Sequence, residues 1–109
     1  MEKPINTWNE FWPFYLLQHQ NSTNQRLHFI GTTIGFIAFV FALTHLKLSY
    51  LIIGLFFAYL FAWIGHFVYE KNKPATFKYP LWSFIADQKM FLLILRGKMS
   101  QELDKIKDQ

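Results

Sequence analysis

Two long stretches of this 109-residue chain contain no aspartate, glutamate, lysine or arginine. The first, Phe29 to Leu46, has 18 residues, and the second, Leu48 to Tyr69, has 22. With a rise of about 1.5 Å per residue, helices of these lengths measure roughly 27 and 33 Å, close to the hydrocarbon thickness of a bilayer. Soluble helices are rarely apolar on all sides over such lengths. We therefore predict an all-α membrane protein.

Only Lys47 separates the two apolar stretches, so the two spans are expected to form an antiparallel helical hairpin. Ser22 and Gln25 match a capping box, which places the start of the first span near residue 23. We predict span 1 over about 23–46 and span 2 over about 48–71. The composition agrees, because a chain with 52% hydrophobic and 17% charged residues is too apolar for an ordinary soluble domain of this size. Its length leaves room for a single membrane domain, residues 1–109.

The basic residues predict the orientation of the hairpin. Five of them flank the spans and one lies in the turn: Lys3, Arg26, Lys71, Lys73 and Lys78 against Lys47. Positively charged flanks stay in the cytoplasm, so both chain ends are expected there. The net charge of +4 favours contact with anionic lipid, and no nucleic-acid partner is expected, because the basic residues form no separate patch. The absence of cysteine excludes disulfides and thiol chemistry.

Amphipathic segments are predicted on both sides of the hairpin. Residues 8–20 follow a capping box that begins at Thr7, and we expect an interfacial helix whose aromatic side chains face the lipid. Pro13 is expected to kink this helix or to delay its start to about Trp12. Residues 80–96, which begin with a proline and precede a glycine, are predicted as an interfacial or partly inserted helix. Residues 98–109 form a polar tail, either a short helix or a frayed end.

Small residues recur at helical spacing in both spans. Gly31 and Gly35 lie on one face of the first, and Gly54, Ala58 and Ala62 lie on one face of the second. Such stripes allow helices to approach closely in lipid. Packing within the hairpin is the favoured use, because both spans carry a stripe. A homo-oligomer stays an open alternative, since two spans make a narrow platform.

Three of the four histidines are predicted to meet at one depth. His28 lies 19 residues before Lys47 and His66 lies 19 residues after it, so an antiparallel hairpin brings them level. His19 precedes the first span at the same level, and Glu70 shares a helix face with His66. Three imidazoles and a carboxylate suit a divalent transition metal, as in non-haem iron oxygenases. The alternative for each histidine is an interfacial anchor or a hydrogen-bonded helix end.

Three further residues have open roles. His45, at the opposite end of the hairpin, is expected only to be solvated. Lys71 is expected to set topology and contact lipid phosphates, with a substrate carboxylate as the alternative partner. Asp87 either faces water or supplies a further site carboxylate.

Two sequence motifs lie at the ends of the hairpin. One leads into the first span, and the other includes the end of the second span. Residues 19–28 have the pattern H-x-N-x-x-N-x-x-x-H, and residues 65–75 have the pattern G-H-x-x-[aromatic]-E-K-x-x-P-A. In this order, on either side of a membrane hairpin, they resemble the 2-hydroxy-fatty-acid dioxygenase family. The resemblance covers most of the chain from His19 to Ala75, and its specificity comes from the two motifs together.

The resemblance implies an iron(II) enzyme that uses dioxygen to shorten a 2-hydroxy fatty acid by one carbon, with release of carbon dioxide. It also implies the roles of the motif residues. These are His19, His28 and His66 as iron ligands, Glu70 as a fourth ligand or as a carboxylate that orients a histidine, and Asn21 and Asn24 as substrate-binding or supporting residues. The short chain, with few apolar segments, points to a bacterial relative in the cytoplasmic membrane.

Two other functions are compatible with the same residues. One is a non-catalytic membrane module that binds a metal or an anionic lipid through the histidines. The other is a structural hairpin that assembles with partners through its glycine stripe and binds no metal.

Overall fold

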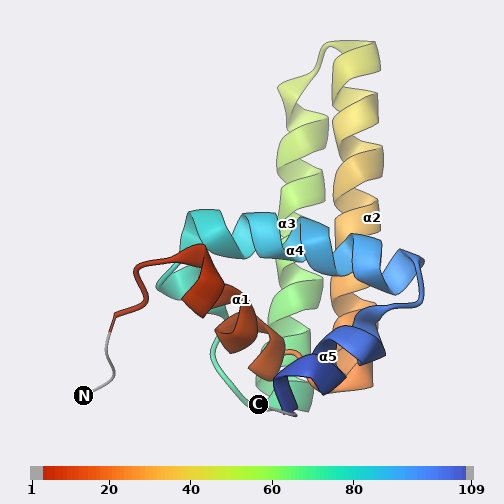
Figure 1. The fold of residues 1–109 in the computed structure, drawn as a ribbon. Helices are drawn as coiled ribbons and strands as arrows, with labels where there is room; N and C mark the ends of the chain where they lie inside the picture. Colours follow the sequence, from red (N-terminus) through yellow and green to blue (C-terminus); the bar gives the residue numbers. More distant parts are fainter. Residues whose placement is uncertain (1–3, 108–109) are drawn as a thin grey trace.

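The computed structural model describes residues 4–107, and within them every regular element is helical, so the all-α prediction is confirmed. Two long helices stand side by side, and three shorter ones pack beside one half of this pair (Figure 1). Lys3 and residues 108–109 of the predicted tail lie outside the described residues. In chain order the elements are α1 (Trp8–Leu17), α2 (Ser22–His45), α3 (Leu48–Ile64), the π-helix η1 (Gly65–Glu70), the 3-10 helix η2 (Ala75–Phe77), α4 (Pro80–Leu95) and α5 (Met99–Lys107).

Helix α2 begins and ends within one residue of the predicted first span, whereas α3 reaches the end of the predicted second span only together with η1, as the continuous helical segment Leu48–Glu70. Asn21, not Ser22, caps α2, and its side-chain oxygen accepts hydrogen bonds from the backbone N–H groups of Thr23 (2.9 Å) and Asn24 (3.2 Å). The helix therefore starts one residue earlier than expected. At the other end Leu46 adopts a left-handed conformation with φ 51°, which reverses the chain before α3.

Glycine allows α2 and α3 to touch through their backbones. A Cβ atom added at Gly31 would lie 2.8 Å from the carbonyl oxygen of Ala58, and one added at Gly54 would overlap the Cβ of Ala38. Small residues allow such close van der Waals contact between helices, and in lipid this packing is one of the forces that hold helices together. The small residues at these positions are thus used for packing within the pair.

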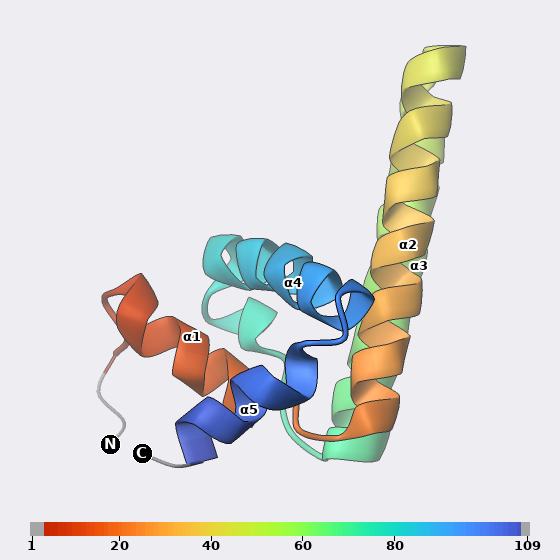
Figure 2. The ribbon, with the colours of Figure 1, turned by 45° about the vertical axis from the view of Figure 1, so that its right-hand side comes forward.

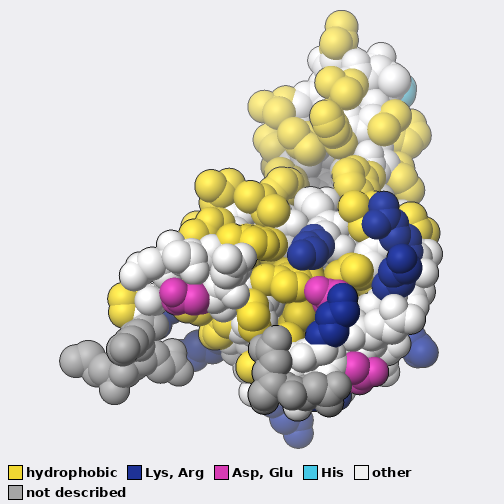
Figure 3. Space-filling model, viewed as in Figure 1, with side chains coloured by type: hydrophobic (Ala, Val, Ile, Leu, Met, Phe, Trp, Pro, Cys, Tyr) yellow, Lys and Arg dark blue, Asp and Glu magenta, His cyan; other side chains and the backbone are white. Residues whose placement is uncertain are grey.

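The outer faces of the pair are apolar. Both α2 and the continuous helical segment Leu48–Glu70 are long and apolar enough to cross a membrane, by length and composition. Near the turn, large apolar side chains such as Val40, Leu43 and Ile52 are exposed. Hydrophobic side chains cover much of this half, whereas the lysines and arginines in view gather over the other half (Figure 3). These two segments are the candidate membrane spans of the protein.

The aromatic face of α1 packs against the protein itself. Thr7 caps the helix as predicted, and the helix continues through Pro13. The prediction that its aromatic residues face lipid is wrong, because α4 and α5 lie beside α1 and supply an apolar partner surface (Figure 2). These three helices and η2 share a buried core that consists of Phe11, Trp12, Tyr15, Leu16, Ala75, Ala86, Met90, Met99 and Leu103.

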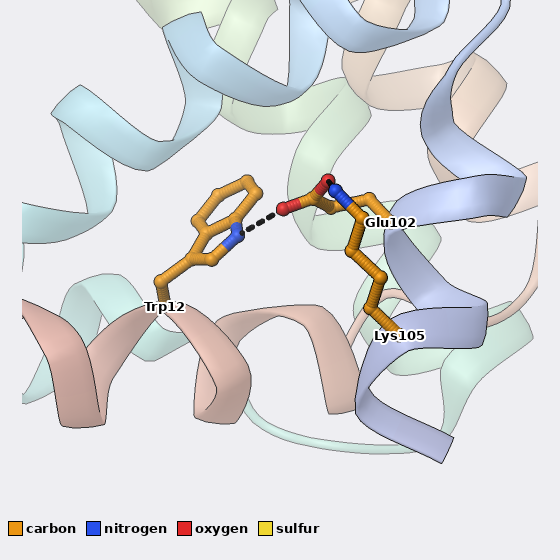
Figure 4. Close-up of polar contacts among 3 residues, drawn as sticks. All are labelled: Trp12, Glu102 and Lys105. Atoms are coloured by element: carbon orange, nitrogen blue, oxygen red, sulfur yellow. Dashed lines mark hydrogen bonds and ion pairs between the residues drawn. The ribbon is translucent and has the colours of Figure 1, made fainter. Parts of the chain in front are cut away.

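Polar contacts tie the C-terminal helix to α1. The indole Nε1 of Trp12 donates a hydrogen bond to Glu102 Oε1 at 3.1 Å, and Lys105 Nζ lies 3.3 Å from the other carboxylate oxygen (Figure 4). Lys89 Nζ of α4 lies 4.2 Å from the centre of the Trp12 ring. At this distance the positive charge of the lysine is attracted to the π electrons of the ring. Of the two alternatives for the polar tail, the structure contains the short helix, α5.

Replacing Gly31 by leucine is expected to push α2 and α3 apart, because even a Cβ atom at this position meets backbone. Overpacking of this kind costs about 1–3 kcal/mol. The thermal unfolding midpoint in detergent, followed by circular dichroism, should fall. The matched control is Gly35→Ala, whose Cβ would lie 3.9 Å from the Ala58 side chain, an ordinary contact. Equal midpoints for Gly31→Leu and Gly35→Ala would contradict this packing.

Candidate metal centre

Three buried histidines meet at the end of the α2–α3 pair that is far from the turn. His19 follows α1, His28 lies in the second turn of α2, and His66 lies in η1. Their exposed fractions are 1%, 5% and 2%. The ring centroids are 4.5 to 4.9 Å apart, and one nitrogen from each ring lies within 4.8 Å of the other two.

The Nδ1 atom of every ring points to an oxygen of the chain. A carbonyl oxygen only accepts hydrogen bonds, so each Nδ1 carries the ring proton and donates it. The three acceptors are the Tyr15 carbonyl oxygen for His19 (2.6 Å), the Asn24 carbonyl oxygen for His28 (3.0 Å) and the Asn72 side-chain oxygen for His66 (2.7 Å).

With Nδ1 protonated, each neutral ring presents an unprotonated Nε2. The Nε2 atoms of His19 and His28 are 3.3 Å apart, so their lone pairs approach each other with no proton between them. This contact is repulsive unless a cation lies nearby. Neutral imidazole nitrogens are good ligands for divalent zinc, copper, iron and nickel. The donor set therefore fits a bound metal ion.

The space among the rings also fits one ion. A cavity of about 10 Å³ is lined by the three histidines together with Tyr15, Ser83 and Asp87. A volume of this size holds about one water molecule. The Ser83 hydroxyl oxygen is buried and has no hydrogen-bond partner among the described residues. It is available to a ligand of the metal.

Burial keeps His19 ready to bind a metal. Loss of hydration lowers the pKa of His19 well below its usual value, and the neighbouring His28 and His66 lower it further. The ring is therefore neutral at physiological pH. Metal binding then requires no displacement of a proton from it.

A π-helix carries His66. Single π turns inside α-helices are frequent at functional sites, and this one widens the last turn of the second long helix. Gly65 lies directly against Asn24 of α2, because a Cβ atom at Gly65 would overlap the Asn24 side chain. Lys71 ends the π-helix in a left-handed conformation with φ 61°, and its side chain is exposed.

Glu70 joins η1 to the start of α2. Its Oε1 accepts hydrogen bonds from the backbone N–H of Asn21 (2.5 Å) and from the side-chain amide of Asn24 (3.3 Å). Among the described residues, the group of potential ligand atoms that lie close together consists of the three histidines alone. Of the two roles expected for Glu70, this placement favours support of the centre over ligation.

Asn72 is a supporting residue that the sequence analysis missed. Its side-chain oxygen accepts from His66, and its side-chain nitrogen donates to the Gln18 carbonyl oxygen at 3.1 Å. Asn72 therefore connects the His66 ring to the segment that carries His19. It lies within the second motif, six residues after His66, but no helical spacing relates the two, because the chain reverses at Lys71.

Asp87 and Tyr15 form the polar wall beside the rings. The Tyr15 hydroxyl donates to Asp87 Oδ1 at 2.5 Å, and the Tyr15 ring stacks on His19 with centroids 3.9 Å apart. Asp87 therefore lines the small cavity among the rings, and the sequence analysis had not named Tyr15 as part of its wall. His45 is exposed at the far end of α2, as expected.

Removing the Asn72 side chain is expected to weaken metal binding roughly 10- to 100-fold, because supporting partners of metal-bound histidines typically contribute this much. The measurement is a titration of the metal-free protein with Co(II), followed by its visible absorption. Asn72→Asp keeps an acceptor oxygen and should restore most of the affinity. Asn9→Ala, on the exposed side of α1, is the control. Equal affinity of Asn72→Ala and the wild type would contradict the role of Asn72.

The partly buried carboxyl of Asp87 is expected to make stability depend on pH. Burial raises the pKa of Asp87 from 3.8 to about 7. Between these values the folded protein holds a proton that the unfolded chain has lost, so stability falls with rising pH by up to about 1.4 kcal/mol per pH unit. The stability difference between wild type and Asp87→Asn, measured without metal, should therefore shrink or reverse towards neutral pH. Parallel pH profiles for the two proteins would contradict a raised pKa.

One of three comparisons with known proteins identifies a family. A search of curated proteins and of solved structures finds no significant match. A family model described as 2-hydroxy-palmitic acid dioxygenase Mpo1-like matches residues 5–99, which include all three histidines, the Glu70 network and Asp87. The chain therefore belongs to the 2-hydroxy-palmitic acid dioxygenase Mpo1-like family.

Proposed function

We propose that this protein is an iron(II)-dependent dioxygenase that shortens 2-hydroxy fatty acids by one carbon at a membrane surface. The observation that carries the proposal is the arrangement of His19, His28 and His66, whose unprotonated Nε2 atoms face a space of one ion. The family description supports the substrate class.

The overall reaction requires no reductant besides the substrate. A 2-hydroxy acid and one dioxygen yield the carboxylic acid one carbon shorter, carbon dioxide and water. The substrate loses four electrons, the bond between its carboxyl carbon and the hydroxyl-bearing carbon breaks, and dioxygen takes up all four electrons. Ferrous iron, when bound, supplies the redox chemistry with dioxygen that zinc lacks.

The protein residues hold and orient the reacting groups. The three histidines leave further metal positions open, because the described residues bring no other close ligand atom to the group. Tyr15 donates a hydrogen bond to one oxygen of Asp87, and among the described residues none donates to the second oxygen. Asp87 itself lines the cavity. We propose that this second oxygen accepts the proton that the substrate hydroxyl releases.

The remaining predicted residues receive supporting roles in this proposal. Glu70, Asn21 and Asn24 hold η1 against the start of α2, which keeps His66 and His28 at a constant separation. Lys71 is exposed at the same end of the pair, where its charge attracts the substrate carboxylate or lipid phosphates.

The proposed location is a bacterial cytoplasmic membrane. In this arrangement α2 and the segment Leu48–Glu70 cross the bilayer, and the metal centre lies at its cytoplasmic surface. Among the described residues near that end are Arg26, Lys71 and Lys73, against Lys47 in the turn. A centre at the surface lets the polar head of a fatty acid reach the metal while its hydrocarbon chain stays in an apolar environment.

Purified protein reconstituted anaerobically with ferrous iron is expected to consume oxygen when 2-hydroxypalmitate is added, with one carbon dioxide released per dioxygen. His28→Ala should abolish both signals while circular dichroism stays unchanged. His45→Ala is the matched control and should retain activity, because His45 lies outside the centre. Zinc-loaded protein should be inactive.

Two outcomes would contradict this function. Product formation that persists in His28→Ala would mean that the histidine group is not the active site. Metal binding without oxygen uptake, in iron-loaded wild type with 2-hydroxy acids of several lengths, would instead favour a non-catalytic metal-binding module.

A further inference from the structure

An apolar cavity extends from the metal centre along the two long helices. Its volume is about 160 Å³, and its walls come from α2, α3 and α4. His28 and Asp87 line it at one end, and both also line the small cavity among the histidine rings. The far end is lined by Phe39 and Leu51, which lie toward the turn between α2 and α3. The cavity therefore has a polar end at the metal centre and an apolar end within the candidate spans.

We propose that this cavity, named here the chain groove, binds the hydrocarbon chain of the 2-hydroxy acid, and that Gly35 and Phe39 determine which chain lengths are accepted. The inference rests on the proposed function, because that function places the carboxylate of the substrate at the histidines. From there the chain runs along α2 toward the turn.

The order of side chains along the groove matches the order of groups in an amphiphile. On α2 the lining residues pass from His28 through Thr32 to Gly35 and Phe39. On α3 the walls opposite are Leu51, Leu55 and Ala58. Cavities with apolar walls stay free of water and take up apolar molecules. A hydrocarbon chain that continues from a head group at His28 toward the turn would run between Gly35, Phe39, Leu51 and Leu55, which are all apolar.

Gly35 is the strongest sign that the groove is kept open. At Gly31 and Gly54 an added Cβ atom would collide with the partner helix, so close packing accounts for those glycines. At Gly35 an added Cβ would make only an ordinary contact, 3.9 Å from the Ala58 side chain. Packing between helices therefore does not require glycine at this position. Because Gly35 has no side chain, the middle of the groove stays open.

The length of the groove gives an expected chain length. His28 and Phe39 are 11 residues apart on α2, which corresponds to about 16 Å along the helix axis. Carbon–carbon bonds of about 1.5 Å at tetrahedral angles advance an extended chain by roughly 1.3 Å per carbon. The groove thus accepts about a dozen carbons beyond the head group, and acids of roughly 14 to 16 carbons fit it best.

The groove is open toward the bilayer in the proposed arrangement. Phe36 and Phe39 of α2 and Phe84 of α4 line it and are themselves 42–49% exposed. Helix α4 lies across one half of the pair and leaves the half near the turn uncovered (Figure 2). The head-group end is therefore covered by protein, and the rest of the chain has lateral access from lipid.

Oxygen uptake with a series of saturated 2-hydroxy acids, from octanoate to stearate, tests the proposal. Gly35→Leu should lower turnover of 2-hydroxypalmitate roughly 10- to 100-fold relative to 2-hydroxydecanoate, the range in which apolar pockets discriminate chain length. Phe39→Ala should shift the preferred length toward stearate. Ile37→Phe adds bulk on an exposed position of α2 that does not line the groove, and it should leave the length profile unchanged.

The outcomes separate this inference from the proposed function. If Gly35→Leu lowers turnover equally at all chain lengths, or not at all, the chain does not follow the groove, although the wild-type activity still supports the enzyme. If the wild type is inactive with every acid, a photoreactive 2-hydroxypalmitate with a terminal diazirine decides the inference separately. Cross-links to Phe39, Leu51 or Leu55 would support the groove, and labelling only of positions outside it, such as Ile37, would overturn it.

Discussion

Hydrogen bonds from the Nδ1 atoms of His19, His28 and His66 decide what this site can do. Their acceptors belong to three different places in the chain, namely the last turn of α1, the first turn of α2 and the segment after η1. Each bond places the ring proton on the outer side of the cluster and the lone pair on the inner side. The rings can face one another only when α1, α2 and η1 are all in their native positions. The centre is therefore a product of the whole fold.

The two long helices serve packing and, in our proposal, substrate binding through different small residues. Gly31 and Gly54 allow the two helices to approach closely, and in a bilayer such contact helps to hold helices together. Gly35 contributes little to that contact and borders the apolar cavity beside His28. The small residues of the two long helices thus have two uses. Gly31 and Gly54 serve helix packing, whereas Gly35 leaves space in the cavity.

The three short helices bring the remaining groups to the pair. Their common core holds Tyr15 and Met90, and it sets His19 and Asp87 beside the histidines of the long helices. The prediction that the aromatic side of α1 faces lipid was wrong for a physical reason. An apolar helix face is equally suited to lipid and to a protein core, and only the positions of α4 and α5 decide between them.

Properties that depend on neighbours along the chain were predictable from sequence. The two charge-free stretches indicated the long helices, and equal spacing from Lys47 indicated that His28 and His66 lie level. Only the tertiary structure identified Asn72, Tyr15 and Ser83, and it alone placed Asp87 at the centre. The Tyr15–Asp87 bond joins residues 72 positions apart. No helical period relates such residues, since their contact depends on how α4 folds back over α1 after the chain has passed through both long helices.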